Sequence, residues 1–249
     1  MPRLLALIPH PDDESYSFGG MLAMAARARW DCRVECATAG AAGARFDGGP
    51  ADREDLARAR LRELDASCSL LGTAPPRCWG LPDGGLASEP SQASRIGRLV
   101  SELSPDVVVT LGLDGAYGHP DHLALTRWVV EAWELLGREA PPLLFAAFPR
   151  GLFLPQYRAC IGMMGEPPQP AAEALGAVPP DFWLPVGCVS RQKLAAISAH
   201  RSQLPRGDPE RLFPPGIVRA LLPREGFSLF DPAHMPAVAH LLLSLDSEV

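Results

Sequence analysis

Two kinds of hydrophobic pattern alternate along the first 150 residues of the chain. Short runs that are apolar or alternating, bounded by turn residues, are typical of buried strands. They occupy residues 4–8, 32–38, 106–111 and 142–148. The longer segments between them have helical composition or an amphipathic repeat, and they occupy residues 19–30, 51–72 and 121–137. This alternation predicts an α/β fold with a mostly parallel sheet, right-handed crossovers and helices on both faces.

Two residues mark helix ends within this pattern. Gly72 follows the last apolar position of the segment 51–72 and predicts a C-cap there. Pro120 comes directly before the segment 121–137. It suits the first position of a helix, where no backbone N–H is needed.

The pattern changes after residue 150. Prolines cluster in the stretches EPPQP and VPPDFWLP, and helical composition returns at 190–203 and near 234–245. We expect one domain over residues 1–249, with a core over 1–150 and a Pro-rich cap with C-terminal helices over 151–249. Because variable loops on a rigid scaffold carry specificity, we expect substrate choice to depend on this cap.

Composition is that of an ordinary soluble globular protein, with 47% hydrophobic and 21% charged residues. The formal net charge of −6 argues against nucleic acid or an anionic membrane as a partner, because both require a basic surface. We expect no signal peptide and no membrane-spanning segment. The six cysteines form no CxxC pair, which favours reduced thiols in the cytoplasm. Homo-oligomerisation is left open.

The first candidate chemistry follows the first strand, in the stretch LLALIPHPDDES. A histidine and three acids stand within five residues: His10, Asp12, Asp13 and Glu14. Neighbouring carboxylates repel one another unless a positive charge lies among them. A metal ion is therefore expected at this position, with further ligands from elsewhere in the chain.

A second polar cluster follows the strand at 106–111. It contains His119, Asp121 and His122, at the start of a helix. In an open parallel sheet, ligands bind beyond the carboxyl ends of the strands, so the two clusters should meet at one edge. Catalytic zinc needs three nitrogen or oxygen ligands and one open position. Spacing alone does not decide which of Asp12 and Asp13 is a ligand.

These residues resemble the LmbE-like, or PIG-L-type, metal-dependent N-acetylglucosaminyl deacetylases. PHPDDE at 9–14 and GHPDH at 118–122 are similar to the two signature motifs of that family. Weaker matches are RLRELDASCSLLG at 60–72, LPDGGL at 81–86 and KLAAISAHRSQ at 193–203. The resemblance implies a Rossmann-like fold and a zinc-dependent deacetylase, with iron as an alternative metal.

The resemblance also implies a role for each residue of the metal centre. His10, Asp13 and His122 would hold the metal ion. Asp12 would be the general base that deprotonates the attacking water. Asp121 would orient one of the ligating histidines.

Four further residues would act on the substrate. His119 would stabilise the oxyanion or protonate the leaving amine, and Tyr117 would help to polarise the amide carbonyl. Arg60 and Asp83 would contact the sugar. The expected reaction is removal of the acetyl group from an N-acetylglucosamine-type small molecule.

Two alternatives remain open at this point. The chain could be an amidase that acts on thiol conjugates or other N-acyl groups, or a non-catalytic paralogue that binds a sugar. A dinucleotide-binding role is not expected, because no GxGxxG follows the first strand. Ala41 is a departure from the family pattern, since many relatives carry an acid in this loop.

Several other conspicuous residues are expected to have structural roles. We expect Trp128 and Trp133 in the core, and His234 and His240 at the surface or in the core. We expect His200 to cap its helix or to support the site. The arginines of 53–62, apart from Arg60, should form a solvated helix face.

Overall fold

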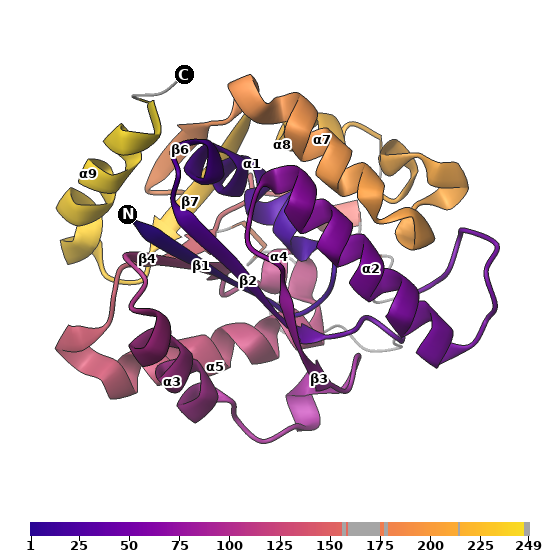
Figure 1. The fold of residues 1–249 in the computed structure, drawn as a ribbon, viewed down its shortest axis with the longest axis horizontal. Helices are drawn as coiled ribbons and strands as arrows, with labels where there is room; N and C mark the ends of the chain where they lie inside the picture. The colour runs from indigo at the N-terminus through magenta and orange to yellow at the C-terminus, as the bar shows by residue number, and fades with distance from the viewer. Residues whose placement is uncertain (156–157, 159–174, 177–178, 214, 247–249) are drawn as a thin grey trace.

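The computed structural model describes residues 1–155, 158, 175–176, 179–213 and 215–246, and its centre is one seven-stranded sheet. The strand order is β3-β2-β1-β4-β5-β7-β6 (Figure 1). The strands are β1 (Arg3–Ile8), β2 (Asp31–Thr38), β3 (Arg77–Leu81), β4 (Val107–Leu111), β5 (Leu143–Ala146), β6 (Phe182–Pro185) and β7 (Arg224–Leu229). The first five run parallel, and β7 pairs antiparallel with β5 and β6. The predicted α/β class with a mostly parallel sheet is confirmed.

Helices cover both faces of the sheet, as Figure 1 shows. One face carries α1 (Asp13–Arg27), α2 (Arg53–Leu71), α7 (Ser190–Ala199), α8 (Ile217–Leu221) and α9 (Met235–Asp246), and the other carries α3 (Ala93–Leu103) and α5 (Pro120–Leu136). Each face has its own apolar core. Alternate residues of β1 pack into the two cores: Leu4, Ala6 and Ile8 belong to one, and Leu5 and Leu7 belong to the other. Burial on both faces explains why this strand is apolar without interruption.

The predicted strands and long helices of the first 150 residues are present. Gly72 ends α2 in the left-handed conformation at φ 83°, and Pro120 is the first residue of α5. Trp128 and Trp133 are buried in the core, as expected. The pattern did not reveal β3, α3 or the short helix α4 (Gly115–Gly118).

Helix α1 begins at Asp13, six residues before the expected helical segment. Its first turn carries Asp13 and Glu14, and acids are favourable there because the helix N-terminus is positive. The polar cluster therefore starts the helix instead of preceding it in a loop. The helix is interrupted at Phe18, whose φ of −147° is not helical.

A buried ion pair stabilises this interruption. The carboxylate of Glu225 in β7 accepts hydrogen bonds from the backbone N–H groups of Gly20 and Met21, at 2.6 and 2.8 Å. Lys193, the one lysine of the chain, lies 2.6 Å from the same carboxylate and is 0% exposed. The pair therefore satisfies backbone donors that the kinked helix leaves free.

The sheet continues past residue 150, where the sequence analysis places a cap. Strands β6 and β7 extend it, and α7 packs against α1 and α2. Both strands are short and contain Pro185 and Gly226, which hide a strand pattern. The stretch EPPQP lies outside the described residues. Among the described residues, none of the helices combines the length and the apolar character that crossing a membrane requires.

Candidate metal centre and active-site pocket

The two polar clusters meet beyond the carboxyl ends of β1 and β4. These strands are neighbours, with Ala6 opposite Val109, so the segments that follow them emerge side by side. A cavity of about 440 Å³ opens at this edge. Its walls include the predicted residues His10, Asp12, Asp13, Arg60, Asp83, Tyr117, His119 and His122. The ninth predicted site residue, Asp121, is 0% exposed and lies behind His10.

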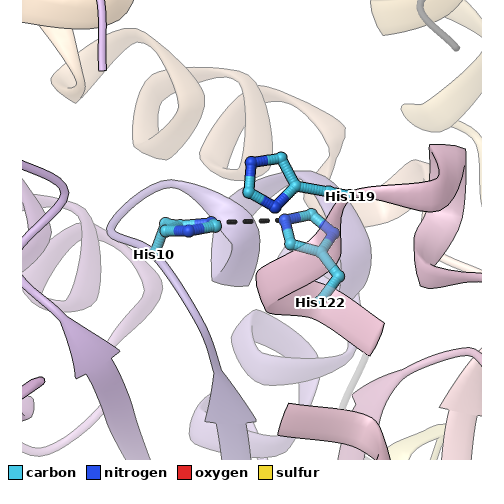
Figure 2. Close-up of side chains that lie close together, drawn as sticks. All are labelled: His10, His119 and His122. Atoms are coloured by element: carbon cyan, nitrogen blue, oxygen red, sulfur yellow. Dashed lines mark hydrogen bonds between the residues drawn. The ribbon is translucent and has the colours of Figure 1, made fainter. Parts of the chain in front are cut away.

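Three predicted ligand atoms lie close together on the cavity floor. His10 Nδ1 is 3.2 Å from His122 Nε2 and 3.3 Å from a carboxylate oxygen of Asp13. His122 Nε2 is 3.5 Å from the other carboxylate oxygen of Asp13. Figure 2 shows His10 and His122 facing each other, with His119 beside them.

Hydrogen bonds on the far side of each ring determine which nitrogen carries the proton. His10 Nε2 lies 3.2 Å from Asp121 and 3.1 Å from Asp83, and carboxylates only accept, so this nitrogen donates. His122 Nδ1 lies 3.1 Å from the carbonyl oxygen of Gly115 and donates to it. When His10 is neutral, its Nδ1 therefore has a lone pair, as His122 Nε2 does, and both nitrogens lie beside Asp13.

The spacing of these atoms fits a tetrahedral metal ion. With bonds of about 2.0–2.1 Å, ligand atoms around zinc are separated by about 1.6 bond lengths, or about 3.3–3.4 Å. His10 Nδ1 lies at about that separation from His122 Nε2 and from one Asp13 oxygen, at 3.2 and 3.3 Å, and His122 Nε2 lies 3.5 Å from the other Asp13 oxygen. The side chains of His10, Asp13 and His122, the predicted ligands, therefore lie close enough together to bind one metal ion beside the cavity.

The charge of the cluster also favours a cation. Burial alone would lower the pKa of His10, but hydrogen bonds with Asp121, Asp13 and Asp83 raise it well above its ordinary value. Burial lowers the pKa of His122 to about 4, so its ring is neutral near pH 7. In the absence of a metal, the cluster attracts a proton, and metal binding would displace that proton.

Two other groups of side chains also come within ligand distance. His10, His119 and His122 form one, and His10, Asp83 and Asp121 form the other, each with atoms within 4.8 Å. In the second group the carboxylates already have partners. Asp121 accepts from the N–H groups of Gly84 and Leu86, and Asp83 accepts from that of Ala42. These bonds tie the loops after β2 and β3 to the histidine cluster.

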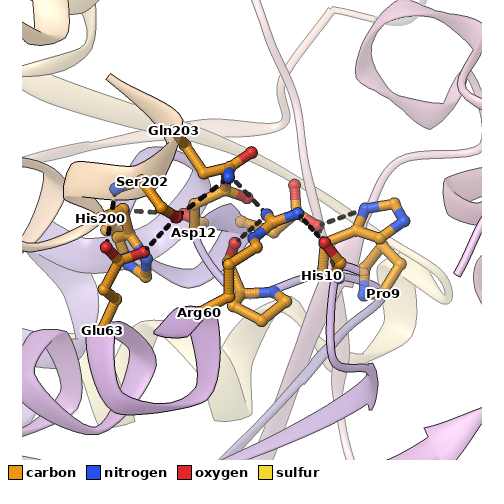
Figure 3. Close-up of polar contacts among 12 residues, drawn as sticks. Pro9, His10, Asp12, Arg60, Glu63, His200, Ser202 and Gln203 are labelled. Carbon is orange, nitrogen blue, oxygen red and sulfur yellow. Dashed lines mark hydrogen bonds and ion pairs between the residues drawn. The ribbon is translucent and has the colours of Figure 1, made fainter. Parts of the chain in front are cut away.

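Asp12 borders the cavity in a strained conformation. Its φ is 120° and its ψ is −30°, in a region that residues with a Cβ rarely occupy. Arg60 Nη2 lies 3.1 Å from its carboxylate (Figure 3). Burial raises the pKa of Asp12 to about 6, against the lowering effect of the Arg60 guanidinium.

Arg60 is more buried than a substrate contact requires. It is 4% exposed, and besides Asp12 its guanidinium donates to the carbonyl oxygens of Gly40 and Pro11, at 2.9 and 2.5 Å. The loop allows this approach because a Cβ on Gly40 would lie 2.3 Å from Arg60 Nη1. Arg53, Arg58 and Arg62 are exposed, as expected for the rest of that helix face.

Glu14 and His200 form a buried pair beneath Asp12, a connection that the sequence analysis missed. Glu14 accepts hydrogen bonds from Asp12 N at 3.0 Å and Ser67 Oγ at 2.5 Å, and its Oε1 lies 2.8 Å from His200 Nε2. Both residues belong to stretches that resemble the family: Glu14 is the third acid of PHPDDE, and His200 is the histidine of KLAAISAHRSQ. Only the fold could show that the two residues meet.

Ser202 and Gln203, which follow this histidine, also have defined partners. Glu63 accepts from the backbone N–H and the hydroxyl of Ser202, both at 2.7 Å. Gln203 donates to the carbonyl oxygen of Ala44 at 3.0 Å and lines the cavity (Figure 3). His234 and His240, expected at the surface or in the core, lie at the surface, half-buried and exposed respectively.

His119 and Tyr117 lie on the side of the cavity formed by the loop after β4. His119 Nδ1 accepts from the backbone N–H of Asp121 at 3.2 Å and caps helix α5. Burial lowers the pKa of His119 to about 3. The Tyr117 ring lies 5.3 Å from that of His122 and 6.0 Å from that of His119, centroid to centroid. Ala41 does not line the cavity, but its neighbours Ala42 and Gly43 do.

Comparison with known proteins identifies relatives of this chain. The family model described as PIG-L, GlcNAc-PI de-N-acetylase, matches residues 5–133. A 1D-myo-inositol 2-acetamido-2-deoxy-alpha-D-glucopyranoside deacetylase of Nakamurella multipartita is 30% identical, over 95% of this chain and 86% of the relative. A probable N-acetyl-alpha-D-glucosaminyl L-malate deacetylase 2 of Bacillus cereus is 29% identical, over 81% of this chain and 83% of the relative.

Solved structures share the fold. GalB, the 4-carboxy-2-hydroxymuconate hydratase from Pseudomonas putida, superposes with a TM-score of 0.69 at 18% identity, over 93% of this chain and 97% of that one. A hydratase with this architecture shows that the fold alone does not determine the reaction. The match to the family model over more than half of the chain, together with a relative of 30% identity over nearly its whole length, shows that the chain belongs to the PIG-L family.

Proposed function

We propose that this protein is a zinc-dependent deacetylase that removes the acetyl group from an N-acetylglucosamine-type small molecule. The observation that carries the proposal is that the side chains of His10, Asp13 and His122 approach one another to 3.2–3.5 Å, with the Asp12 carboxylate on the same cavity. The names of the curated relatives support the substrate class. Iron is the alternative metal, since the same ligands accept it.

The reaction joins a water oxygen to the acetyl carbon and breaks the C–N bond, giving acetate and a free amine. It needs a nucleophile, stabilisation of the oxyanion and a proton for the amine. When bound, the metal lowers the pKa of water to about 7 and polarises the carbonyl. His10, Asp13 and His122 would hold it.

Asp12 is the proposed general base. Its carboxylate faces the cavity, and a pKa of about 6 is close to the value that suits proton transfer at neutral pH. Asp12 would accept the proton of the attacking water and then donate it to the departing amide nitrogen, which leaves as the free amine. Arg60 fixes the carboxylate at 3.1 Å, so we propose that Arg60 positions the base as well as lining the cavity.

His119 is the proposed oxyanion donor. Because its Nδ1 accepts from the N–H of Asp121, the single proton of the neutral ring is on Nε2. A neutral ring can donate a hydrogen bond to a developing negative charge but has no extra proton for the amine. This arrangement supports oxyanion stabilisation over the alternative role of acid. Tyr117, on the same wall, is proposed to assist at the carbonyl.

Asp121 and Asp83 complete the proposed site. Asp121 accepts the Nε2 proton of His10 and so keeps Nδ1 available for the metal. Asp83 shares that proton and reaches the cavity, where it can accept from a sugar hydroxyl. The placement of β6 and β7 in the common sheet supports a single domain over residues 1–249. The free thiols of Cys32, Cys36 and Cys68 support a reducing, cytoplasmic compartment.

The test uses two neighbouring substitutions of equal size. Wild type, Asp12→Asn and Asp13→Asn are purified without chelator, and metal content and acetate release from N-acetylglucosamine conjugates are measured. We expect about one metal ion in wild type and in Asp12→Asn, with activity lost in both variants and metal lost in Asp13→Asn. Wild-type protein without metal, or with metal but cleaving only other N-acyl groups, would overturn the proposal.

A further inference from the structure

We propose that the natural substrate carries an uncharged aromatic group at the anomeric carbon of its N-acetylglucosamine unit. This inference rests on the proposed function and concerns the aromatic part of the cavity, in which Tyr117 alone also has a proposed catalytic role. The evidence is a set of five rings that line the cavity, here called the aromatic wall: Tyr16, Tyr117, Phe148, Phe153 and Phe213.

The aromatic wall is continuous. Tyr16 meets Phe213 with ring centroids 5.1 Å apart, and Phe213 meets Phe153 at 5.5 Å. Phe153 in turn meets Phe148 at 4.8 Å and Tyr117 at 5.9 Å. Most of these contacts are edge-to-face, the arrangement that aromatic rings prefer. The rings come from four separate parts of the chain, so the wall is built by the fold and not by a local sequence run.

The wall extends from the metal centre to the cavity mouth. At its inner end the Tyr117 ring lies 5.3 Å from His122. At the mouth stands Phe46, which also lines the cavity although it is 44% exposed. Phe46 thus adds an apolar surface that a substituent leaving the cavity could cover. A group attached to a sugar whose acetamide reaches the metal would lie against these rings.

The charges of the cavity disfavour an acidic substituent. Among the described residues that line it, Arg60 is the one arginine and no lysine is present. Both terminal nitrogens of Arg60 already donate to Asp12, Pro11 or Gly40. Asp12, Asp13 and Asp83 are acids. A carboxylate or phosphate on the substrate would therefore meet three acids and a single guanidinium, whose remaining nitrogen, Nε, is buried without a hydrogen-bond partner among the described residues.

A polyol substituent is also poorly matched to this wall. Among the described residues, Tyr16 Oη is buried without a hydrogen-bond partner and could bond one substrate hydroxyl. The rings of Phe148, Phe153 and Phe213 offer none, so the other hydroxyl groups of a polyol would lose water there at a cost for each unpaired group. An aromatic substituent loses little on desolvation and gains ring contacts of about 0.5–1.5 kcal/mol each, or about two- to twelve-fold in affinity. The wall therefore selects against inositol-type and malate-type conjugates and for aryl ones.

The first experiment compares substrates. Acetate release is measured on phenyl N-acetylglucosaminide, hexyl N-acetylglucosaminide, free N-acetylglucosamine, and N-acetylglucosamine joined to inositol or to malate. We expect kcat/KM for the phenyl compound to exceed that of each other compound by at least about twofold, the size of one ring contact. Equal or faster reaction of the inositol or malate conjugate overturns the inference, and equal reaction of the hexyl compound overturns its aromatic part.

The second experiment uses a matched pair of exposed phenylalanines. Phe46→Ser removes a ring at the cavity mouth, and Phe230→Ser removes one that is 38% exposed and does not line the cavity. Phe213→Leu removes a ring from the wall but keeps an apolar side chain. We expect the ratio of kcat/KM for the phenyl compound to that for free N-acetylglucosamine to fall in Phe46→Ser and Phe213→Leu, but not in Phe230→Ser. An unchanged ratio in both Phe46→Ser and Phe213→Leu would contradict the assignment.

Binding separates this inference from the proposed function. Calorimetry measures the affinity of the product-like amine, phenyl glucosaminide, against inositol glucosaminide, in wild type and Phe46→Ser. Tighter binding of the phenyl amine that depends on Phe46 supports the aromatic wall even if no acetate is released, in which case only the deacetylase proposal fails. Equal binding of the two amines overturns the wall, whatever the activity.

Discussion

The carboxylate of Glu14 accepts a 3.0 Å hydrogen bond from the backbone N–H of Asp12, two residues earlier in the chain. Asp12 has a φ of 120°, a conformation that costs about 1–3 kcal/mol and persists only where neighbouring groups hold it. Glu14 is itself held by Ser67 and His200. The orientation of the proposed base thus depends on a buried pair that never reaches the cavity.

Removing this support should impair catalysis without removing the metal. We expect Glu14→Ala to lower kcat about 10- to 100-fold, the usual cost of losing a partner that orients a reactive group, while metal content and KM stay near wild type. Glu63→Ala is the control, because Glu63 is half-buried and holds Ser202 instead of Asp12. A loss of metal in Glu14→Ala would show that Glu14 organises the ligands and not the base.

The Glu14–His200 pair should make stability depend on pH. Burial alone would lower the pKa of His200, but the charge and hydrogen bond of Glu14 raise it above its ordinary value. The stabilisation is then complete below about pH 6.5, the ordinary value for histidine, and is lost as pH rises through the folded-state pKa. His200→Gln should destabilise the protein by about 1–3 kcal/mol at pH 6 and by less at pH 9 in urea unfolding. A difference that grows with pH would contradict this sign.

Arg60 should set the pH at which the proposed base titrates. Its positive charge lowers the pKa of Asp12, against the effect of burial. Replacing it in Arg60→Gln removes that charge, so the acidic limb of the kcat/KM profile should move upward by about one pH unit or more. Arg60→Lys keeps the charge and should move the limb less. If neither variant shifts the limb, another group controls it.

Alanine substitutions at Gly40 and Gly48 test how closely the loop after β2 packs against Arg60. Gly40 and Gly48 both have positive φ, 68° and 78°, but a Cβ on Gly48 would meet nothing within 4 Å. Gly48→Ala should therefore cost only the conformational penalty of about 1–2 kcal/mol. Gly40→Ala should cost more, because its Cβ would displace Arg60, and it should also lower kcat. Equal unfolding free energies in the two variants would argue that Arg60 moves aside freely.

Much of this site could be predicted from the sequence because it lies at strand ends. The apolar runs located β1 and β4, and the tendency of ligands to bind at the carboxyl edge of a parallel sheet was enough to bring His10 and His122 together. No apolar run of similar length marks β6 or β7 in the sequence. They are short, carry Pro185 and Gly226, and depend on pairing with β5 for their conformation.

The direction in which side chains point was the second feature that could not be predicted from the sequence. The motif placed Arg60 near the site, but only the fold shows its guanidinium turned toward Asp12 and two carbonyl oxygens. The aromatic wall joins residues as far apart as Tyr16 and Phe213, and their contact at 5.1 Å has no periodic signal in the chain. Contacts of this kind depend on packing between distant segments.

The burial of Lys193 offers a way to measure local unfolding of the core. It is the one lysine of the chain, its amine forms an ion pair with Glu225, and the residue is 0% exposed. A reagent that acylates amines meets no lysine side chain on the folded surface, so consumption of Lys193 requires the core around α1, α7 and β7 to separate. Mass spectrometry of timed acylation would therefore report opening of this core from a single side chain, with no label or engineered probe.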